Sequence, residues 1–148
     1  MAEFELERTI HRPVGEVFAF LADFRHGTQW QAGVENLRVV PDAPAEVGTR
    51  ITERRRLQGH VVDLSYRVVA LEPGKRIAVE SAGGPVAYSG VQDFSPTDDG
   101  SGTHLRFALD VKLTGGMRLL SGLIAPAVRK QVESDLDRLA WVLENPPK

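Results

Sequence analysis

The sequence predicts an α+β fold in which a curved antiparallel sheet of about six to seven strands packs against one long C-terminal helix. Two observations support this prediction. Between residues 34 and 113, runs rich in β-branched and aromatic residues alternate with turn signals, as in a β-meander. Residues 116–144 instead repeat their apolar side chains at helical spacing. A sheet with one apolar face and a helix with one apolar stripe bury both surfaces by packing together.

The N-terminal segment predicts one strand followed by two short helices. Apolar and polar residues alternate over residues 4–10, as in a strand with one solvated face, and Arg8 interrupts the apolar side. Pro13 then opens a short amphipathic helix that should end near Asp23. A second short helix is expected around residues 26–30.

Turn signals divide residues 34–113 into strands. They are Gln58-Gly59, Pro73-Gly74, Gly83-Gly84 and the polar stretch 98–102. Two-residue loops at the first three points predict facing pairs across each hairpin: Arg55 with Val62, Glu53 with Leu64, Ile51 with Tyr66, Tyr66 with Ser81, Val68 with Val79, Ala70 with Ile77, Val79 with Tyr88, and Ser81 with Val86. This register gives one continuous, mostly apolar face, which a one-residue slip would destroy. The last strand extends that face with Leu105, Phe107, Leu109 and Val111.

The final segment predicts the principal helix, over residues 116–144. Its apolar stripe consists of Leu120, Ile124, Val128, Val132, Leu136, Leu139 and Leu143. Pro126 lies in its first half and should kink the helix or end a preceding turn, because proline lacks a backbone donor.

Length and composition bound the class of protein. A chain of 148 residues suits a single domain, residues 1–148, and 42% hydrophobic with 26% charged residues excludes disorder as its default state. A net charge of −2 gives no reason to expect a nucleic-acid partner. The absence of cysteine excludes a disulfide framework, a thiolate metal site and a cysteine nucleophile.

The sequence also predicts a cytoplasmic location. The first residues are acidic and contain no apolar signal core. No stretch approaches the roughly 18 consecutive apolar residues that a membrane-spanning helix requires. We therefore expect no integral membrane segment. A homodimer through an edge strand of the predicted sheet is compatible with the sequence, although no residue supports it.

The order of elements resembles the helix-grip fold of the START-like, birch-pollen-allergen-like (SRPBCC) superfamily, and most closely its polyketide cyclase/dehydrase branch of small bacterial proteins. The resemblance covers essentially the whole chain. It rests on structural motifs: residues 10–18 (IHRPVGEVF), the spacing from Asp23 to Trp30, the turns at 47–50 and 72–76, Gly102-Thr103, and the terminal helix at 136–144. These motifs specify a fold rather than a chemistry.

The resemblance implies a cavity between the sheet and the long helix that holds a hydrophobic small molecule. The sequence adds independent support, because a few polar side chains fall on the apolar inner face, as is usual for a small-molecule site. They are Glu53, Arg55, Tyr66, Ser81, Tyr88 and Gln92. Trp30 is a candidate wall of the entrance, and Leu120, Ile124 and Val128 face either the core or the cavity.

Glu53 and Arg55 admit two interpretations. Two ionisable groups on an apolar face cost several kcal/mol each unless they are paired or hydrated. They either orient a ligand inside the cavity or lie at a solvated strand end, paired with each other or with water. The run Arg54-Arg55-Arg56 favours the solvated strand end.

Evidence for catalysis is weaker. Tyr66 and Tyr88 suit hydrogen bonding to a ligand carbonyl or acid catalysis, with Arg55 as a further candidate, but core tyrosines with a satisfied hydroxyl are commoner. The four histidines have no partner at the spacing of a metal site, so no metal is expected. The glycine pairs lack the pattern of a phosphate-binding loop, and nothing indicates a cofactor.

Three functions follow from these observations. The first is a carrier or sensor for a lipid, isoprenoid or polyketide-like molecule. The second is a polyketide cyclase or dehydratase acting in the same cavity. The third and weakest is an interaction module like the activators of chaperones, which share this fold.

Overall fold

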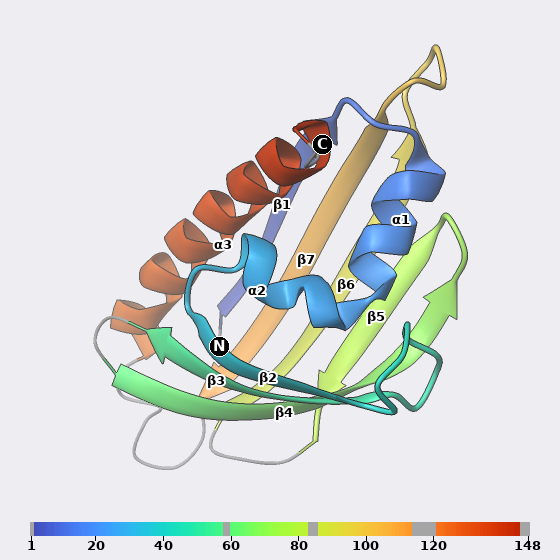
Figure 1. Ribbon diagram of the computed structural model, residues 1–148. Coiled ribbons are helices and arrows are strands. Elements are labelled where there is room, and N and C mark those ends of the chain that lie inside the picture. Colours follow the sequence, from blue (N-terminus) through green and yellow to red (C-terminus); the bar gives the residue numbers. More distant parts are fainter. Residues whose placement is uncertain (1, 58–59, 83–85, 114–120, 146–148) are drawn as a thin grey trace.

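The computed structural model describes residues 2–57, 60–82, 86–113 and 121–145 and has the predicted α+β architecture, a curved seven-stranded antiparallel sheet with one long helix (Figure 1). The strand order is β1-β7-β6-β5-β4-β3-β2. The elements are β1 Ala2–Ile10, α1 Val14–Ala22, a 3-10 turn at Phe24–His26, α2 Gly27–Trp30, β2 Val34–Val40, β3 Arg50–Leu57, β4 His60–Glu72, β5 Arg76–Ser81, β6 Val86–Pro96, β7 Thr103–Leu113 and α3 Ser121–Glu144.

The two short helices form as the sequence predicts. Pro13 is the residue that precedes α1, and the apolar side of α1 is buried. The helix ends at Asp23, whose backbone is extended. The Asp23 carboxylate accepts a hydrogen bond from the Arg25 amide at 3.1 Å, which starts the 3-10 turn that leads into α2. This turn and α2 lie over the concave side of the sheet (Figure 1).

The first two hairpins confirm most of the predicted register. Arg55 faces Val62 across β3 and β4, and Tyr66 faces Ser81 across β4 and β5. The expected pairing of Ala70 with Ile77 is wrong, since Leu71 takes that place after a bulge in β4.

The bulge follows from the loop that joins β4 and β5. That loop has three residues rather than two, and its central residue, Gly74, has a φ of 72°, which suits glycine. The extra residue is absorbed in β4 by the bulge, which turns the larger Leu71 toward the core in place of Ala70.

The third hairpin differs from the prediction by two residues. Val79 faces Gly90 rather than Tyr88, and Glu80 faces Ser89. The predicted register would have paired Pro85 with Ala82, where proline has no N–H to donate to the ladder. A shift of two residues preserves the side-chain alternation, so the inward set of residues is the same.

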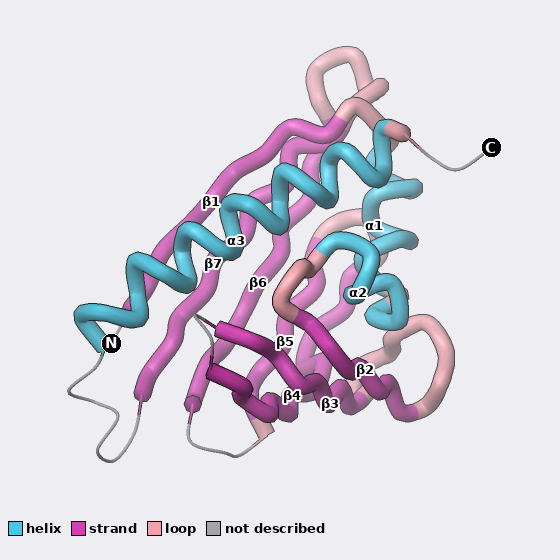
Figure 2. The backbone as a smooth tube through the Cα atoms, turned by 60° about the vertical axis from the view of Figure 1, so that its left-hand side comes forward, coloured by secondary structure: helices cyan, strands magenta, loops and turns pink. Residues whose placement is uncertain are grey.

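Helix α3 supplies the main cover of the sheet. It lies lengthwise along β1 and β7, while β2, β3 and β4 form the other part of the curved sheet, below α2 in the view of Figure 2. Three residues of its predicted stripe, Val132, Leu136 and Leu139, are buried against β1 and α1 residues in one core cluster. The helix continues through Pro126, so proline does not end it. The predicted beginning of this helix, at 116–120, lies outside the described residues.

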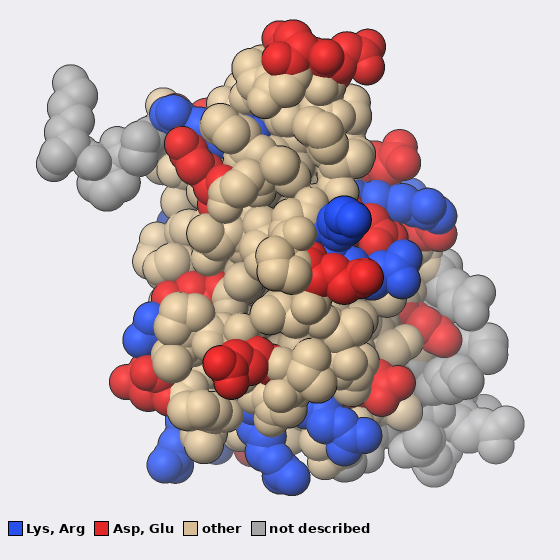
Figure 3. Space-filling model, turned by 90° about the vertical axis from the view of Figure 1, so that its right-hand side faces the viewer, with Lys and Arg blue, Asp and Glu red and all other residues tan. Residues whose placement is uncertain are grey.

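Charged side chains of both signs are interspersed over the exterior. Figure 3 shows Lys and Arg next to Asp and Glu on one face of the molecule. Several form surface pairs, such as Arg76 with Asp93 at 2.7 Å and Arg106 with Glu5 at 2.6 Å. In the part of the chain that the structure describes, no helix has the length and apolar character needed to cross a membrane.

Candidate ligand-binding site

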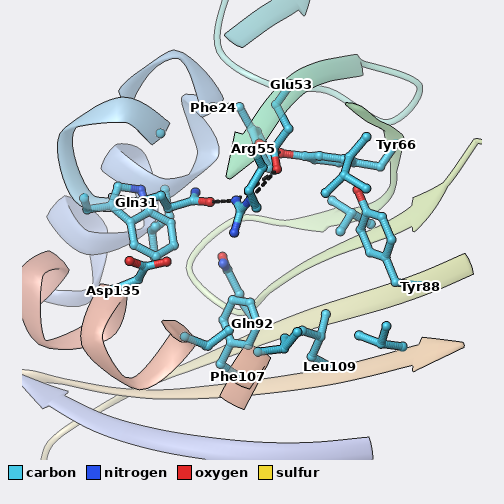
Figure 4. A pocket seen from close by; sticks show the side chains of 18 of the residues that line it. Phe24, Gln31, Glu53, Arg55, Tyr66, Tyr88, Gln92, Phe107, Leu109 and Asp135 are labelled. Carbon is cyan, nitrogen blue, oxygen red and sulfur yellow. Dashed lines mark hydrogen bonds and ion pairs between the residues drawn. The ribbon is translucent and has the colours of Figure 1, made fainter. Parts of the chain in front are cut away.

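A cavity of about 170 Å³ lies between the concave face of the sheet and the helices α2 and α3 (Figure 4). Its wall is mostly apolar, with polar side chains from β3, β4, β6, α3 and the segment around α2. The described lining residues are Leu21, Asp23, Phe24, Gly27, Trp30, Gln31, Glu53, Arg55, Val62, Leu64, Tyr66, Val79, Tyr88, Gln92, Phe107, Leu109, Val111, Val128, Val132 and Asp135.

Alternation along β3 brings Glu53 and Arg55 to the cavity. Successive side chains of a strand point to opposite faces, so these two share the face of the buried Ile51. Arg54 and Arg56 point outward and form surface ion pairs with Asp63 at 3.0 Å and Glu35 at 2.7 Å. The arginine run is therefore solvated on one face only. Glu53 and Arg55 line the cavity, as the first interpretation places them, and they are paired with each other, as the second expects.

Glu53 is the centre of a buried hydrogen-bond network. Its side chain is 2% exposed and that of Arg55 is 15% exposed. Arg55 Nε donates to Glu53 Oε1 at 2.9 Å, and the Tyr66 hydroxyl donates to Glu53 Oε2 at 3.1 Å. Arg55 also donates to the side-chain oxygen of Gln31, which follows α2. Each Glu53 oxygen thus has a partner, which offsets the cost of burying this carboxylate.

The two tyrosines pack against each other beside this network. Their rings meet edge to face with centroids 5.7 Å apart. Burial, and next the Glu53 charge, raise the pKa of Tyr66 and of Tyr88 above the ordinary value of 10.0. Both phenols are therefore protonated at neutral pH and suited to donate a hydrogen bond rather than to act as bases.

Two buried polar atoms on the cavity wall have no hydrogen-bond partner among the described residues. They are the Tyr88 hydroxyl oxygen and Gln92 Oε1. Buried polar groups in folded proteins nearly always have a partner, and an unsatisfied one costs about 1–3 kcal/mol. Figure 4 shows the Gln92 side chain directed from β6 toward the interior of the cavity. These two atoms are therefore unsatisfied polar groups in the wall of the cavity.

A second buried carboxylate, Asp135, lines the cavity from α3. It accepts hydrogen bonds from the Gln131 side chain at 2.8 Å and from the Ala32 amide at 3.3 Å. Burial raises the pKa of Asp135, and these two hydrogen bonds only partly oppose that shift.

The structure brings most of the predicted site residues to one cavity: Trp30, Glu53, Arg55, Tyr66, Tyr88, Gln92 and Val128. Ser81 is not among the described lining residues. Its hydroxyl instead accepts a hydrogen bond from the Tyr88 amide at 3.1 Å. Leu120 and the side chain of Ile124 lie outside the described part of the structure.

Sequence reasoning missed three polar lining residues, Asp23, Gln31 and Asp135. Asp135 had a signal, since it follows Val132 by three positions and precedes Leu139 by four, and therefore shares their helix face. Gln31 had none, because its position depends on how the segment after α2 folds back over the sheet.

The histidine side chains that the structure describes, those of His11, His26 and His104, are not among the residues that line this cavity. His26 stacks on Phe20 with ring centroids 4.4 Å apart, and His104 contacts the Thr9 hydroxyl at 3.1 Å. Across the described ranges, no three His, Asp or Glu side chains gather as metal ligands would.

Comparison with known families identifies the chain. The family model "Polyketide cyclase / dehydrase and lipid transport" matches residues 1–144. The chain belongs to this family. Comparison with curated proteins gave no significant match.

Solved structures agree with the family assignment and the helix-grip fold. TTHA0849 from Thermus thermophilus is 26% identical, with a TM-score of 0.82 over 96% of this chain and 97% of that one. The Zhui aromatase/cyclase from Streptomyces sp. R1128 is 17% identical, with a TM-score of 0.80 over 96% and 93%. Ara h 8.0201 is 14% identical, with a TM-score of 0.72 over 97% and 98%. The predicted superfamily is thereby confirmed, and the last two likenesses concern the fold alone.

Proposed function

We propose that this member of the polyketide cyclase/dehydrase and lipid transport family is a carrier or sensor that binds a hydrophobic small molecule bearing a hydrogen-bonding group. Lipid, isoprenoid and polyketide-like molecules fit this description. The observation that carries the proposal is the pair of unpartnered polar atoms, Tyr88 Oη and Gln92 Oε1, on an otherwise largely apolar wall.

The cavity fits this ligand class in size and chemistry. An apolar cavity of about 150 Å³ holds a benzene ring, so a cavity of about 170 Å³ has room for a ring of that size. A ligand hydroxyl both donates and accepts, and so complements an amide oxygen and a phenol. Binding would stabilise the protein by satisfying groups that are costly in its empty cavity.

Calorimetric titration with benzyl alcohol, a single-ring probe that suits the cavity volume, tests the proposal, using two variants of β4. Val62 lines the cavity, whereas its neighbour Val61 is 49% exposed. We expect saturable binding to the wild type and to Val61→Trp, and a loss of about tenfold or more in Val62→Trp, whose larger side chain fills the cavity. Equal binding by the two folded variants would place the probe elsewhere and contradict the proposal.

A cyclase or dehydratase is the second candidate function. Arg55 and the Tyr88 hydroxyl border the same cavity and both carry a hydrogen-bond donor, as polarisation of a substrate carbonyl requires. The Zhui aromatase/cyclase shares the fold. Turnover of a polyketide mimic that is lost in Tyr66→Phe, Tyr88→Phe or Arg55→Ala, with the fold intact, would favour the enzyme over the carrier.

The chaperone-activator type of interaction module has less support. A module that acts only through its exterior needs no internal cavity, and a filled interior would have favoured it. The observed cavity, with polar groups directed into it, favours the two ligand hypotheses.

A further inference from the structure

We propose that the cavity discriminates against anionic amphiphiles and prefers uncharged ligands such as alcohols, phenols and ketones. The inference rests on the proposed function and narrows its ligand class. It concerns the charges that line the cavity: among the described lining residues, three carboxylates, Asp23, Glu53 and Asp135, stand against one cation, Arg55.

The single lining guanidinium is already neutralised by the protein. Arg55 forms an ion pair with Glu53 at 2.9 Å and also donates to Gln31. The Glu53 side chain is 2% exposed, so solvent does not screen this pair strongly. A ligand carboxylate approaching Arg55 would have to displace Glu53 or share its cation, and either event leaves one buried carboxylate without a full countercharge.

Asp135 adds negative charge that the lining cation, Arg55, opposes only at a distance and without an ion pair. The residue is 3% exposed, and the two groups that donate hydrogen bonds to it, the Gln131 side-chain amide and the Ala32 backbone N–H, are neutral. It belongs to none of the ion pairs between described residues. A carboxylate ligand would bring a further negative charge into the same low-dielectric space, where like charges repel far more strongly than in water.

The third lining carboxylate, Asp23, adds no net charge to the cavity, because it is paired with Arg25. It is held by Arg25, whose Nη2 lies 2.7 Å from Asp23 Oδ2, and the Arg25 side chain is directed to the exterior, where it also contacts Asp42. That pair is locally neutral and offers no cation to the cavity. An uncharged ligand meets none of these penalties, and its oxygen still complements Tyr88 and Gln92.

Calorimetry with two matched probes tests the inference. At neutral pH, benzyl alcohol is uncharged and benzoate is an anion with the same ring. We expect the wild type to bind the alcohol at least about tenfold more tightly, which is the effect of a modest charge repulsion. Asp135→Asn removes one charge with little change of shape and should reduce this preference several-fold. Asp137→Asn changes the same net charge on the same helix at the exposed partner of Arg8, and should preserve the preference.

Glu53→Gln provides a second and independent variant. It leaves Arg55 with an unpaired positive charge at the cavity wall, so benzoate affinity should rise relative to that of benzyl alcohol. Wild-type protein that binds benzoate as tightly as benzyl alcohol would overturn the charge discrimination while preserving the proposed function. A preference that persists unchanged in both Asp135→Asn and Glu53→Gln would also overturn it. Failure of both probes to bind would refute the proposed function itself.

Discussion

The unpartnered Tyr88 hydroxyl leads to an unusual expectation, that removing it stabilises the protein. Tyr88→Phe deletes a buried oxygen that has no hydrogen-bond partner among the described residues and leaves the ring contact with Tyr66 intact. Relief of the desolvation penalty should raise the free energy of unfolding by about 1 kcal/mol, which corresponds to a Tm increase of roughly 2–4 °C at this chain length.

Tyr66→Phe is the matched comparison, because it removes the same atom from the adjacent ring. The Tyr66 hydroxyl donates to the buried Glu53 carboxylate, and a hydrogen bond to a charged group contributes about 1.5–3 kcal/mol. We therefore expect Tyr66→Phe to lower the unfolding free energy by about 2 kcal/mol. The same substitution should act with opposite sign at the two positions.

Urea denaturation of the ligand-free protein, followed by circular dichroism, measures both effects with the wild type as reference. Thermal unfolding provides an independent reading of the sign. Equal destabilisation by Tyr88→Phe and Tyr66→Phe would contradict an unsatisfied Tyr88 hydroxyl, and would show that it has a partner of the same strength as Tyr66.

Three further outcomes are expected. Arg55→Met should lower the unfolding free energy by about 3–5 kcal/mol by leaving Glu53 buried without a countercharge. Arg54→Met, at a solvent-exposed pair, should leave the urea midpoint close to that of the wild type. Leu71→Ala should cost roughly 2 kcal/mol, because the bulge turns Leu71 inward; a neutral effect would favour the register predicted from sequence. Because burial raises the pKa of Asp135, the folded protein binds the Asp135 proton more tightly than the unfolded chain does. The resulting contribution to the free energy of unfolding is fully present below the unfolded pKa near 3.8, and it is lost as the pH rises through the folded pKa. The stability of Asp135→Asn relative to wild type should therefore increase between acid and neutral pH, and urea titrations that show no such trend would argue against a raised pKa.

Side-chain alternation explains why much of the site was predictable. A strand has a period of two, so the pattern of β3 and β4 alone places Glu53, Arg55 and Tyr66 on one face. The wrong register predicted for the third hairpin leaves the set of inward-facing residues unchanged, because a shift of two residues preserves alternation. The polar character of the inner wall was therefore visible in the sequence before any register was known.

Other features depend on geometry that a linear pattern does not contain. The bulge in β4 arises from a loop one residue longer than its turn signal implies, and no propensity reports that length. Gln31 contacts Arg55 only because the segment after α2 folds back over the sheet. Whether Glu53 and Arg55 were buried or solvated depended on this cover as well, since the same alternation is compatible with an open strand end.

The buried network relates stability to function. Glu53, Arg55 and Asp135 are ionisable groups in a mostly apolar wall, and well-packed apolar residues in their place are often no less stabilising. Their presence at the cavity is consistent with selection of a ligand rather than with maximal stability.

Native mass spectrometry of the protein purified from its own host tests most directly whether the cavity holds a ligand. We expect the wild type and Val61→Trp to carry a small, uncharged, largely apolar molecule that denaturation releases, and Val62→Trp to lack it. Equal occupancy in both tryptophan variants, or only the bare 16.3 kDa chain in every preparation, would contradict ligand binding in this cavity.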